Sequence, residues 1–405
     1  MKKLGAIIFL FLPACASVGP DLSTAPAESW QGEFYYGDDS AYTSDAPAKI
    51  APWWQAAFDD DRLNRLVVLA DNNNRDIGAA LYRVEEAEAR LSRARRALLP
   101  QGSGSESYSR TNEFMQGQGG QRQETDVYTL SADLQWELDV FGRIRRQRDI
   151  ARAGAAERLA LYEDVMRVVH AGTAQAYFNW LEADRRRAVA QQNLGLQEEA
   201  LRLTQELVNL GASPRFDYDR QLTQARLTEA ALVQLTAARA DALSALALLC
   251  GVTVPELVGL FPEFSGDSGT IDVPDMTPTL GIPNPAVVIR QRPDIASAEA
   301  QYAQALYQIG VAQAELFPQL TFSGSVSQTA FEPEALYDQE SFGFSYGPRL
   351  NWNVFSFPQL LAEVDATGKA AGAAKMAYEN TVLNALTETD SALAQLLPPS
   401  NGRLC

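Results

Sequence analysis

Few residues in this sequence have the types and spacing that catalysis requires. The single histidine, His170, lies in an apolar helical stretch, where an imidazole is more often structural than catalytic. The serine-rich stretch QGSGSES at 101–107 lacks the GK[ST] that completes a phosphate-binding loop. Three carboxylates, Asp133, Glu137 and Asp139, alternate with apolar residues as on one face of a strand. The sequence has no GxSxG elbow and no cluster with metal-ligand spacing, so it predicts neither an enzyme nor a cofactor or metal site.

The composition excludes further classes of function. The chain has 405 residues, 46% of them hydrophobic, and a formal net charge of −17. This length allows two or three ordinary domains, or one fold built from a duplicated half. An acidic chain without a basic patch repels phosphate, so nucleic acid is not expected as a partner. Three cysteines without paired spacing give neither a disulfide framework nor a zinc signature.

The N-terminus has the features of an export signal. Two lysines precede a short apolar run over 4–12, which is too short to span a bilayer as a helix. Residues 1–14 are therefore predicted to be a signal peptide. The tetrapeptide LPAC resembles a bacterial lipobox, with lipid attachment at Cys15. Ala16 follows, where an aspartate would suggest retention in the inner membrane. The alternative is an ordinary signal peptide with a chance cysteine.

A helix-forming segment occurs twice. Residues 75–101 and 293–319 align without a gap at an offset of 218, with eight of 27 positions identical. Both copies reach a proline, Pro100 and Pro318. Their apolar residues follow heptad spacing with alanine at alternate positions, which predicts helices that pack a neighbour along their whole length. The two series are Ile77, Ala80, Val84, Ala87, Leu91, Ala94 and Leu98, and Ile295, Ala298, Tyr302, Ala305, Ile309, Ala312 and Leu316.

The period changes to two after each copy. YTLSADLQWELDV (128–140) and FGFSYGPRLNWNV (342–354) alternate apolar and polar residues, and Trp136 corresponds to Trp352. Such strands are long for a soluble sheet and suit a tilted membrane strand of about 9–11 residues. The mature chain has no run of about 20 continuous apolar residues that predicts a transmembrane helix, so strands would have to cross a membrane.

Each long strand has a partner that precedes it. The stretch 320–327 alternates well and 102–110 alternates poorly, and polar loops over 111–127 and 328–341 join the pairs. The chain therefore predicts two hairpins and four strands. Four strands cannot close a barrel, and open edges are not tolerated in lipid. Two copies would give eight strands, which side chains fill. Three would give twelve, which can leave a pore, so transport favours a homotrimer.

Polar residues of the long strands are candidates for the lining of such a pore. Asp133, Glu137, Asp139 and Arg349 lie on the polar faces, and we expect them to face the lumen. An acidic lumen would favour cations and neutral solutes over anions. The alternative is the solvated face of a soluble sheet.

Long helices follow the first hairpin. One is predicted over 144–210, which extends about 100 Å at about 1.5 Å per residue. The turn NLGASP at 209–214 ends it, and a returning helix is predicted over 216–250. A helix over 62–99 would lie end to end with the returning helix along the single long one. Alanine-rich helices of this length favour an extended tube over a globule.

Five stretches of the sequence resemble the TolC-like outer-membrane efflux proteins, most closely the lipoprotein branch that serves multidrug pumps. They are VGPDL (18–22), PWWQAAFDDDRLNRLV (52–67), WELDVFGRIRR (136–146), GIPNPAVVIRQRPDI (281–295) and IGVAQAELFPQL (309–320). The resemblance covers nearly the whole mature chain. It implies an α+β membrane protein in which a duplicated repeat gives four strands per protomer to a trimeric 12-stranded barrel. The barrel would lie in the outer membrane of a Gram-negative bacterium and continue as an α-helical barrel in the periplasm.

The resemblance also implies a passive function. An inner-membrane pump would supply the energy, a periplasmic membrane-fusion adaptor would open the helical end, and drugs or other small solutes would leave through the duct. The turn Asn209, Leu210, Gly211, Ala212 and Ser213 would be the adaptor-docking tip, although these residues would equally serve a plain interhelical turn. Lipid on Cys15 would anchor the chain in the outer membrane.

The second repeat is predicted to be incomplete. At an offset of 216, Cys250 maps to position 466, about 61 residues beyond Cys405, and the segment PPSNGRLC does not continue a helix. Two alternatives follow: a truncated or frameshifted, non-functional copy of such a channel, and a periplasmic coiled-coil scaffold lipoprotein. The predicted segments are the signal peptide 1–14, a lipidated N-terminal segment 15–61, a first repeat 62–251, a linker 252–291, a second repeat 292–397 and a C-terminal tail 398–405.

Overall fold

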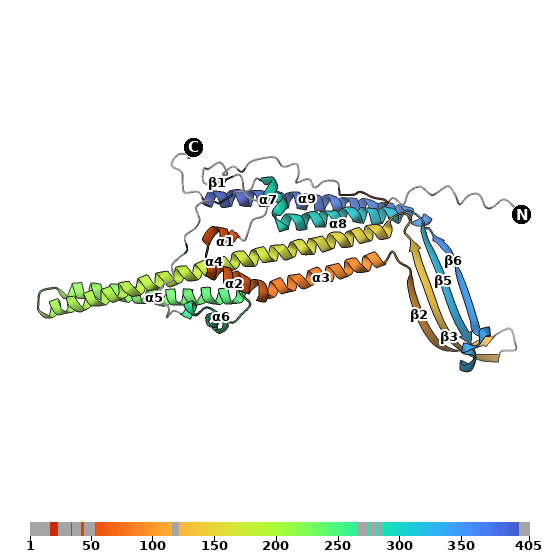
Figure 1. Ribbon diagram of the computed structural model, residues 1–405, viewed down its shortest axis with the longest axis horizontal. Coiled ribbons are helices and arrows are strands. Elements are labelled where there is room, and N and C mark those ends of the chain that lie inside the picture. Colours follow the sequence, from red (N-terminus) through yellow and green to blue (C-terminus); the bar gives the residue numbers. More distant parts are fainter. Residues whose placement is uncertain are drawn as a thin grey trace. The chain divides into compact units, whose positions relative to one another are not determined.

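The computed structural model describes residues 17–22, 34, 42–43, 53–115, 121–265, 274, 280–281 and 285–396. The predicted signal peptide, Cys15 and the tail 398–405 lie outside these residues. The described helices are α1 (Trp53–Phe58), α2 (Asp61–Asn73), α3 (Arg75–Arg96), α4 (Arg143–Asn209), α5 (Arg215–Leu249), α6 (Val254–Leu260), α7 (Pro285–Gln291), α8 (Pro293–Ala314) and α9 (Phe357–Leu396) (Figure 1). The described strands are β1 (Tyr42–Thr43), β2 (Gln101–Met115), β3 (Gln121–Leu138), β4 (Leu280–Gly281), β5 (Gln319–Ala330) and β6 (Phe342–Asn351).

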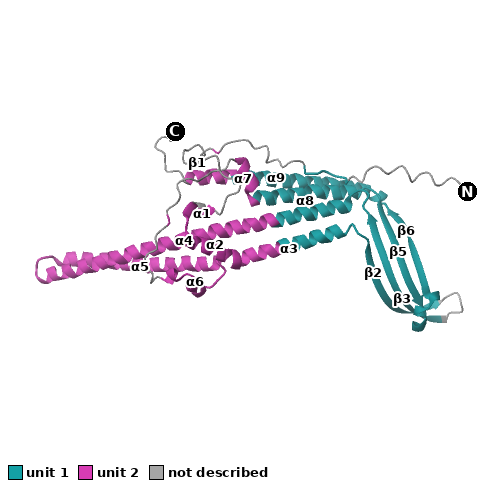
Figure 2. Ribbon diagram, viewed as in Figure 1, with its two compact units in different colours: residues 1–29, 84–158, 294–385 teal, residues 30–83, 159–293, 386–405 magenta. Residues whose placement is uncertain are grey.

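The chain divides into two compact units, which Figure 2 shows in different colours. One unit contains all four long strands, α8 and the parts of α3, α4 and α9 that adjoin them. The other contains α1, α2, α5, α6, α7 and the remainders of α3, α4 and α9. Unit 1 comprises residues 1–29, 84–158 and 294–385, and unit 2 comprises 30–83, 159–293 and 386–405. Each unit therefore combines parts of both halves of the sequence.

The four long strands form one antiparallel sheet in the order β2-β3-β5-β6. Gln101 of β2 pairs with Gln135 of β3, and Gln319 of β5 pairs with Asn351 of β6. The two predicted hairpins are therefore present. The pairing of β3 with β5 joins the hairpin of the first half to that of the second. This sheet confirms the predicted four strands.

The polar loop predicted over 111–127 is wrong in its extent. β2 continues to Met115 and β3 already begins at Gln121. The polar residues continue the ladder because their side chains pair across the strands. The guanidinium of Arg110 donates to both carboxylate oxygens of Asp126, at 2.6 and 2.8 Å. Polarity alone therefore did not mark the end of these strands.

The long strands end earlier than the alternation predicts. β3 ends at Leu138 and β6 at Asn351, rather than at Val140 and Val354. The backbone N–H of Val140 donates to the carbonyl of Leu138 at 2.7 Å, which closes a tight γ-turn at the strand end. The loop predicted over 328–341 is also shorter, because β5 extends to residue 330 and two 3-10 turns follow.

The single helix predicted over 62–99 is interrupted at Asn74. The side-chain oxygen of Asn74 accepts the backbone N–H groups of Asp76 and Ile77 at 2.9 and 3.1 Å, which caps the start of α3. Its side-chain nitrogen donates to the carbonyl of Leu249, at the end of α5, at 2.8 Å. One asparagine thus ends α2, starts α3 and holds the end of a third helix. By contrast, α4 and α5 differ from their predicted bounds by one residue at each end.

A second capping site stabilises the core of unit 2. The side chain of Asp60 caps α2 by accepting the backbone N–H of Arg62 at 2.8 Å, and the hydroxyl of Tyr177 donates to it at 2.7 Å. Burial raises the pKa of Asp60, but these hydrogen bonds outweigh it and leave the pKa below its usual value. Burial and the same carboxylate raise the pKa of Tyr177. Trp180 and Phe264 pack beside this pair in an apolar cluster of the described residues.

Candidate functional site

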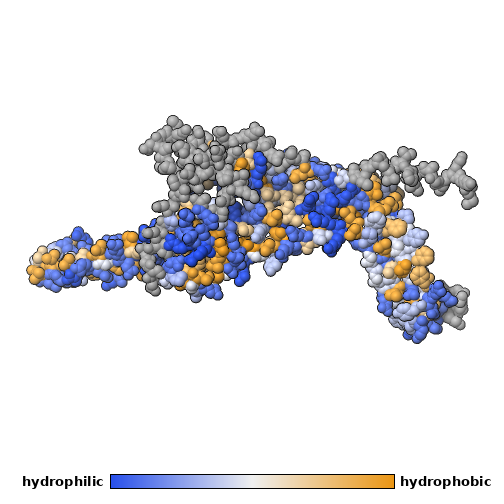
Figure 3. Space-filling model, viewed as in Figure 1, coloured by the Kyte–Doolittle hydropathy of each residue, from blue (hydrophilic) through white to orange (hydrophobic). Residues whose placement is uncertain are grey.

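The two faces of the four-stranded sheet differ in chemistry. Even-numbered residues share one face, because the register pairs even with even across all three strand pairs. This face is apolar and exposed in the protomer, with 43% exposure at Leu134 and 74% at Tyr346, and Figure 3 shows apolar side chains on the strands. Glu106 of β2, opposite Leu130, is a charged exception. The apolar residues of this face include Tyr108, Tyr128, Leu130, Ala132, Leu134, Trp136, Leu320, Phe322, Val326, Phe342, Phe344, Tyr346 and Leu350.

Aromatic residues bound the apolar face of β3. At one end Tyr128 packs against Tyr108 with ring centroids 4.9 Å apart, and at the other end lies Trp136. Eight residue steps separate the two ends, or about 26 Å of extended strand. Beyond Tyr128 the same face becomes polar, with the ion pair of Arg110 and Asp126. At a strand tilt of about 40° this length gives an apolar band about 20 Å tall, and an apolar band between aromatic girdles is the pattern of strands that face lipid.

The opposite face carries mainly hydroxyl groups. The Ser105 and Ser131 hydroxyls lie 2.8 Å apart across β2 and β3, and those of Ser325 and Ser345 lie 2.9 Å apart across β5 and β6. These contacts link neighbouring strands without charge, so the face is polar but only sparsely ionised. Its hydroxyl residues include Ser103, Ser105, Ser107, Ser109, Thr129, Ser131, Thr321, Ser323, Ser325, Ser327, Thr329 and Ser345.

Two corresponding tryptophans join the sheet to the helices. The indole N–H of Trp136 donates to the carbonyl of Leu98 at 3.0 Å, and that of Trp352 donates to the carbonyl of Leu316 at 3.1 Å. Each acceptor lies two residues before the proline that separates helix from strand. The two halves of the chain therefore repeat this hydrogen bond as well as the sequence pattern around it. Tryptophan with one apolar and one polar side is typical of a membrane–water boundary.

The turn between α4 and α5 is a Schellman motif. Gly211 has a φ of +67°, its N–H donates to Val208 at 3.0 Å, and the N–H of Ala212 donates to Leu207 at 2.9 Å. The Ser213 hydroxyl donates to a carboxylate in the first turn of α5. Leu210, just before the glycine, is 81% exposed. A large apolar side chain is thus presented at the end of a helical hairpin.

A family model described as "Outer membrane efflux protein" matches residues 66–252 and 285–398. The chain belongs to this family. It is 28% identical over 401 residues to outer membrane protein OprJ of Pseudomonas aeruginosa, covering 96% of this chain and 79% of OprJ. It is 25% identical over 400 residues to the probable outer membrane lipoprotein SilC of Salmonella typhimurium, covering 97% and 82%. The solved outer-membrane channel OprN superimposes with a TM-score of 0.83 and 29% identity, covering 94% of this chain and 83% of that one.

Membership confirms the predicted fold and family. The four antiparallel strands and long helices are those of the outer-membrane efflux channels. The chain is an outer-membrane channel protein of efflux systems, and the family is not enzymatic. Channels of this family are trimers within tripartite systems and extend into the periplasm. The scaffold alternative is therefore rejected.

Three of the four residues predicted to line the lumen lie on the hydroxyl face. Asp133 accepts a hydrogen bond from the Ser131 hydroxyl at 3.3 Å, and Arg349 lies farther along the same face in β6. Glu137, near the end of β3, receives two hydrogen bonds from the guanidinium of Arg143, at 3.1 and 2.6 Å. The charge of Glu137 is thus balanced by the first residue of α4.

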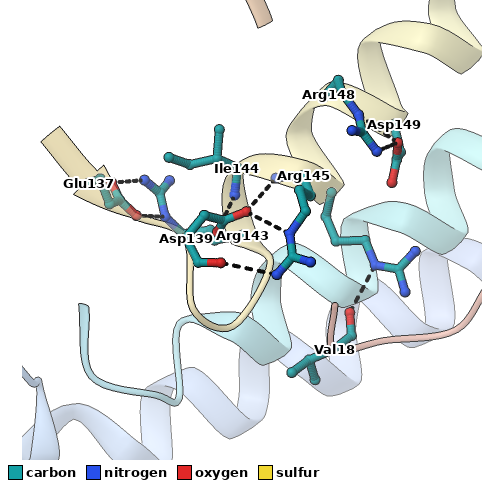
Figure 4. Close-up of polar contacts among 9 residues, drawn as sticks. Val18, Glu137, Asp139, Arg143, Ile144, Arg145, Arg148 and Asp149 are labelled. Carbon is teal, nitrogen blue, oxygen red and sulfur yellow. Dashed lines mark hydrogen bonds and ion pairs between the residues drawn. The ribbon is translucent and has the colours of Figure 1, made fainter. Parts of the chain in front are cut away.

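Asp139 lies beyond the last residue of β3 and caps α4. Its carboxylate accepts the backbone N–H groups of Ile144 and Arg145 at 3.0 and 2.9 Å, and the side chain of Arg145 at 3.1 Å (Figure 4). The first turn of a helix leaves such N–H groups without helical partners, and a carboxylate there also meets the positive end of the helix dipole. The geometry gives Asp139 a structural role at the strand-to-helix junction.

Arg146 is a buried residue that the sequence did not single out. Its side chain is only 2% exposed, although it stands in the cationic run RIRRQR. A run of this kind ordinarily indicates a solvated helix face. The nearest signal was its place within the family stretch WELDVFGRIRR, which marks the position but not its burial.

One helix of the described chain meets the length and composition of a membrane span. The most apolar 18-residue window of α5 has a mean hydropathy of 1.4, and 17% of it is buried. The sequence predicted no such helix. The criterion is one of length and composition alone, and a single such helix does not identify a membrane span. We therefore do not assign α5 to the membrane.

Proposed function

We propose that the chain, with two further copies, forms a passive exit duct for drugs or other small solutes delivered by an inner-membrane pump through a periplasmic adaptor. The carrying observation is the sheet with an apolar face between aromatic residues and a hydroxyl face behind it. When three sheets close into a barrel, the apolar faces meet lipid and the hydroxyls meet water. Uncharged hydroxyls bind no solute class strongly, which suits a conduit. Residues 62–251 and 292–397 are the two repeats, and 252–291 links them.

The channel itself can be tested without its pump. Purified protein in a planar lipid bilayer is expected to give stepwise, water-filled conductance without ATP or an ion gradient as energy source. The same preparation should run as a heat-sensitive trimer on gels. A water-soluble monomer after removal of lipid, with no conductance, would contradict the proposal.

Asp133 and Arg349 are the residues we propose as charged determinants within the duct. Each contributes three charges to a trimer, whereas Glu137 is neutralised locally by Arg143. We expect Asp133→Asn to lower the cation-to-anion permeability ratio roughly twofold. Arg349→Gln should raise the cation-to-anion permeability ratio, and Glu137→Gln should change this ratio less than Asp133→Asn does. The reversal potential under a potassium chloride gradient measures each ratio. An Asp133→Asn channel with unaltered selectivity would place this carboxylate away from the ion path.

We propose that Asn209, Leu210, Gly211, Ala212 and Ser213 form the tip that docks the adaptor. The support is the exposure of Leu210 and the open space around Gly211, where an added Cβ would meet nothing within 4 Å. Leu210→Asp should abolish most efflux in cells while leaving the bilayer conductance of the purified trimer intact. Leu210→Met is the matched control. Retained efflux in Leu210→Asp would make the turn a plain connection between helices.

We propose that Cys15 carries a lipid that anchors the chain in the outer membrane. The support is the LPAC tetrapeptide and the likeness to a relative named as a lipoprotein. The mass of the N-terminal peptide of the purified protein measures the modification directly.

A further inference from the structure

The described segment 17–22 is held by residues from both halves of the sequence. The backbone N–H of Val18 donates to the carbonyl of Phe141, in the turn between β3 and α4, at 3.2 Å. The ring of Phe141 stacks on that of Phe317, in the turn between α8 and β5, with centroids 4.6 Å apart. The segment therefore lies where both helix–strand junctions meet, within one compact unit.

The guanidinium of Arg146 binds this segment through all of its nitrogen atoms. Its Nε donates to the carbonyl of Val18 at 2.9 Å and its Nη2 to the carbonyl of Gly19 at 2.8 Å. Its Nη1 pairs with the Asp21 carboxylate at 2.5 Å, and the guanidinium lies 5.6 Å from the ring centroid of Tyr307 in α8. Only a planar, multidentate cation can serve three acceptors in this arrangement. A buried guanidinium without them would be costly, since its donors would be unpaired.

Three glycines leave room for the segment. Gly19 has a φ of +104°, and an added Cβ would overlap Gly310 of α8. Gly142 has a φ of +84°, and its Cβ would come within 2.6 Å of the Ser17 Cα. A Cβ on Gly310 would lie 2.8 Å from the Val18 carbonyl and 2.9 Å from Arg146 Nε. Backbone passes against backbone at each of these points, which only glycine permits.

We infer that Arg146, Gly142 and Gly310 form a docking site for the chain's own N-terminal segment, which fixes the position of residue 15. Two residue steps, at most about 7 Å of chain, separate Ser17 from Cys15. The site lies just past the end of β3, near the level of Trp136. The inference rests on the proposed lipidation only in its last step: a lipid on Cys15 would enter the bilayer at the ends of the strands.

Arg146 acts here as a positioning residue, because it reaches the anchor only through the segment it binds. A long unstructured tether would let a lipid anchor range over the protein, whereas a docked segment fixes one attachment point. The docking site also bridges the repeats, since Arg146 and Gly142 come from the first and Gly310 from the second. Docking of the N-terminus therefore requires that both junctions have formed.

Hydrogen exchange of the Val18 amide tests the docking in the purified full-length trimer. Arg146→Gln should speed this exchange at least tenfold, while the trimer band and helix content are retained. Arg146→Lys should not restore protection, because an ammonium cannot bond all three acceptors in the fork geometry. Arg148→Gln, on the same helix and paired with Asp149 at 2.7 Å, is the matched control and should leave exchange unchanged.

A second pair of variants covers the case in which Arg146→Gln does not assemble. Gly19→Ala alters only the docked segment and should also speed exchange at Val18 at least tenfold. Its control, Gly368→Ala, places a Cβ in α9 where nothing lies within 4 Å. Exchange that remains slow in Arg146→Gln trimers, or in Gly19→Ala trimers where the former cannot be made, would overturn the docking site.

The mass of the N-terminal peptide separates this inference from the proposed anchor. A lipidated peptide with unchanged exchange in the variants would overturn the docking site and leave the anchor standing. Accelerated exchange with an unmodified peptide would support the docking site and overturn its link to a lipid. Accelerated exchange with a lipidated peptide supports both.

Discussion

Leu134→Arg is expected to remove most of the membrane-inserted trimer. Leu134 lies within the apolar band of β3, two residues from Trp136 and opposite Gly324, and is 43% exposed in the protomer. An arginine on the lipid face of a barrel costs about 2–4 kcal/mol at the bilayer midplane and less toward the interfaces, and each trimer would carry three. The heat-sensitive trimer band in outer-membrane extracts measures the loss.

Ser323→Arg is the matched control for this change. Ser323 pairs with Gln135, so it lies one residue row from Leu134 on the hydroxyl face of the neighbouring strand. The same side chain there should meet water and leave the trimer assembled, with reduced conductance. Equal loss of trimer in both variants would mean that the two faces do not divide lipid from lumen.

Gly251→Ala is expected to destabilise the protein far more than Gly211→Ala. Both glycines end a helix in the same motif, with φ of +68° and +67°. A Cβ on Gly251 would overlap the carbonyl of Asn73, whereas one on Gly211 would meet nothing within 4 Å. Gly211→Ala should therefore cost about 1 kcal/mol for its positive φ. Gly251→Ala should cost about 2–4 kcal/mol, because the backbone must also move.

Thermal unfolding of the detergent-solubilised protein, followed by helix content, compares the two glycines. Asn73, whose carbonyl a Cβ on Gly251 would overlap, is followed by Asn74, which joins α2, α3 and the end of α5. A backbone shift that separates Gly251 from Asn73 should therefore disturb three helices at once. Equal unfolding midpoints for the two variants would contradict the prediction, because they would show that the backbone at Asn73 moves away from the added Cβ without loss of stability.

The sequence determined those elements whose cause is local. The 67-residue α4 and the 35-residue α5 were predicted to within one residue at each end, because helical periodicity and the glycine turn are contained in the segments themselves. β3, β5 and β6 were predicted because their period of two appears within a dozen residues, whereas β2 alternates poorly. The repeated helical segment and the correspondence of Trp136 with Trp352 likewise predicted the duplication, and the hydrogen bonds of the two tryptophans repeat it.

Tertiary structure decided the features that depend on distant partners. The contact of Asn74 with the carbonyl of Leu249, 175 residues away, ties the break between α2 and α3 to the end of α5, and no local pattern indicates that contact. Asp139 matched the alternation of β3, but the start of α4 uses its carboxylate as a cap. Arg146 looks like a surface cation until the chain brings Val18 and Gly19 to it, from 128 and 127 residues away. Periodicity records which face a residue occupies, whereas its partner is fixed only when the remote segments fold together.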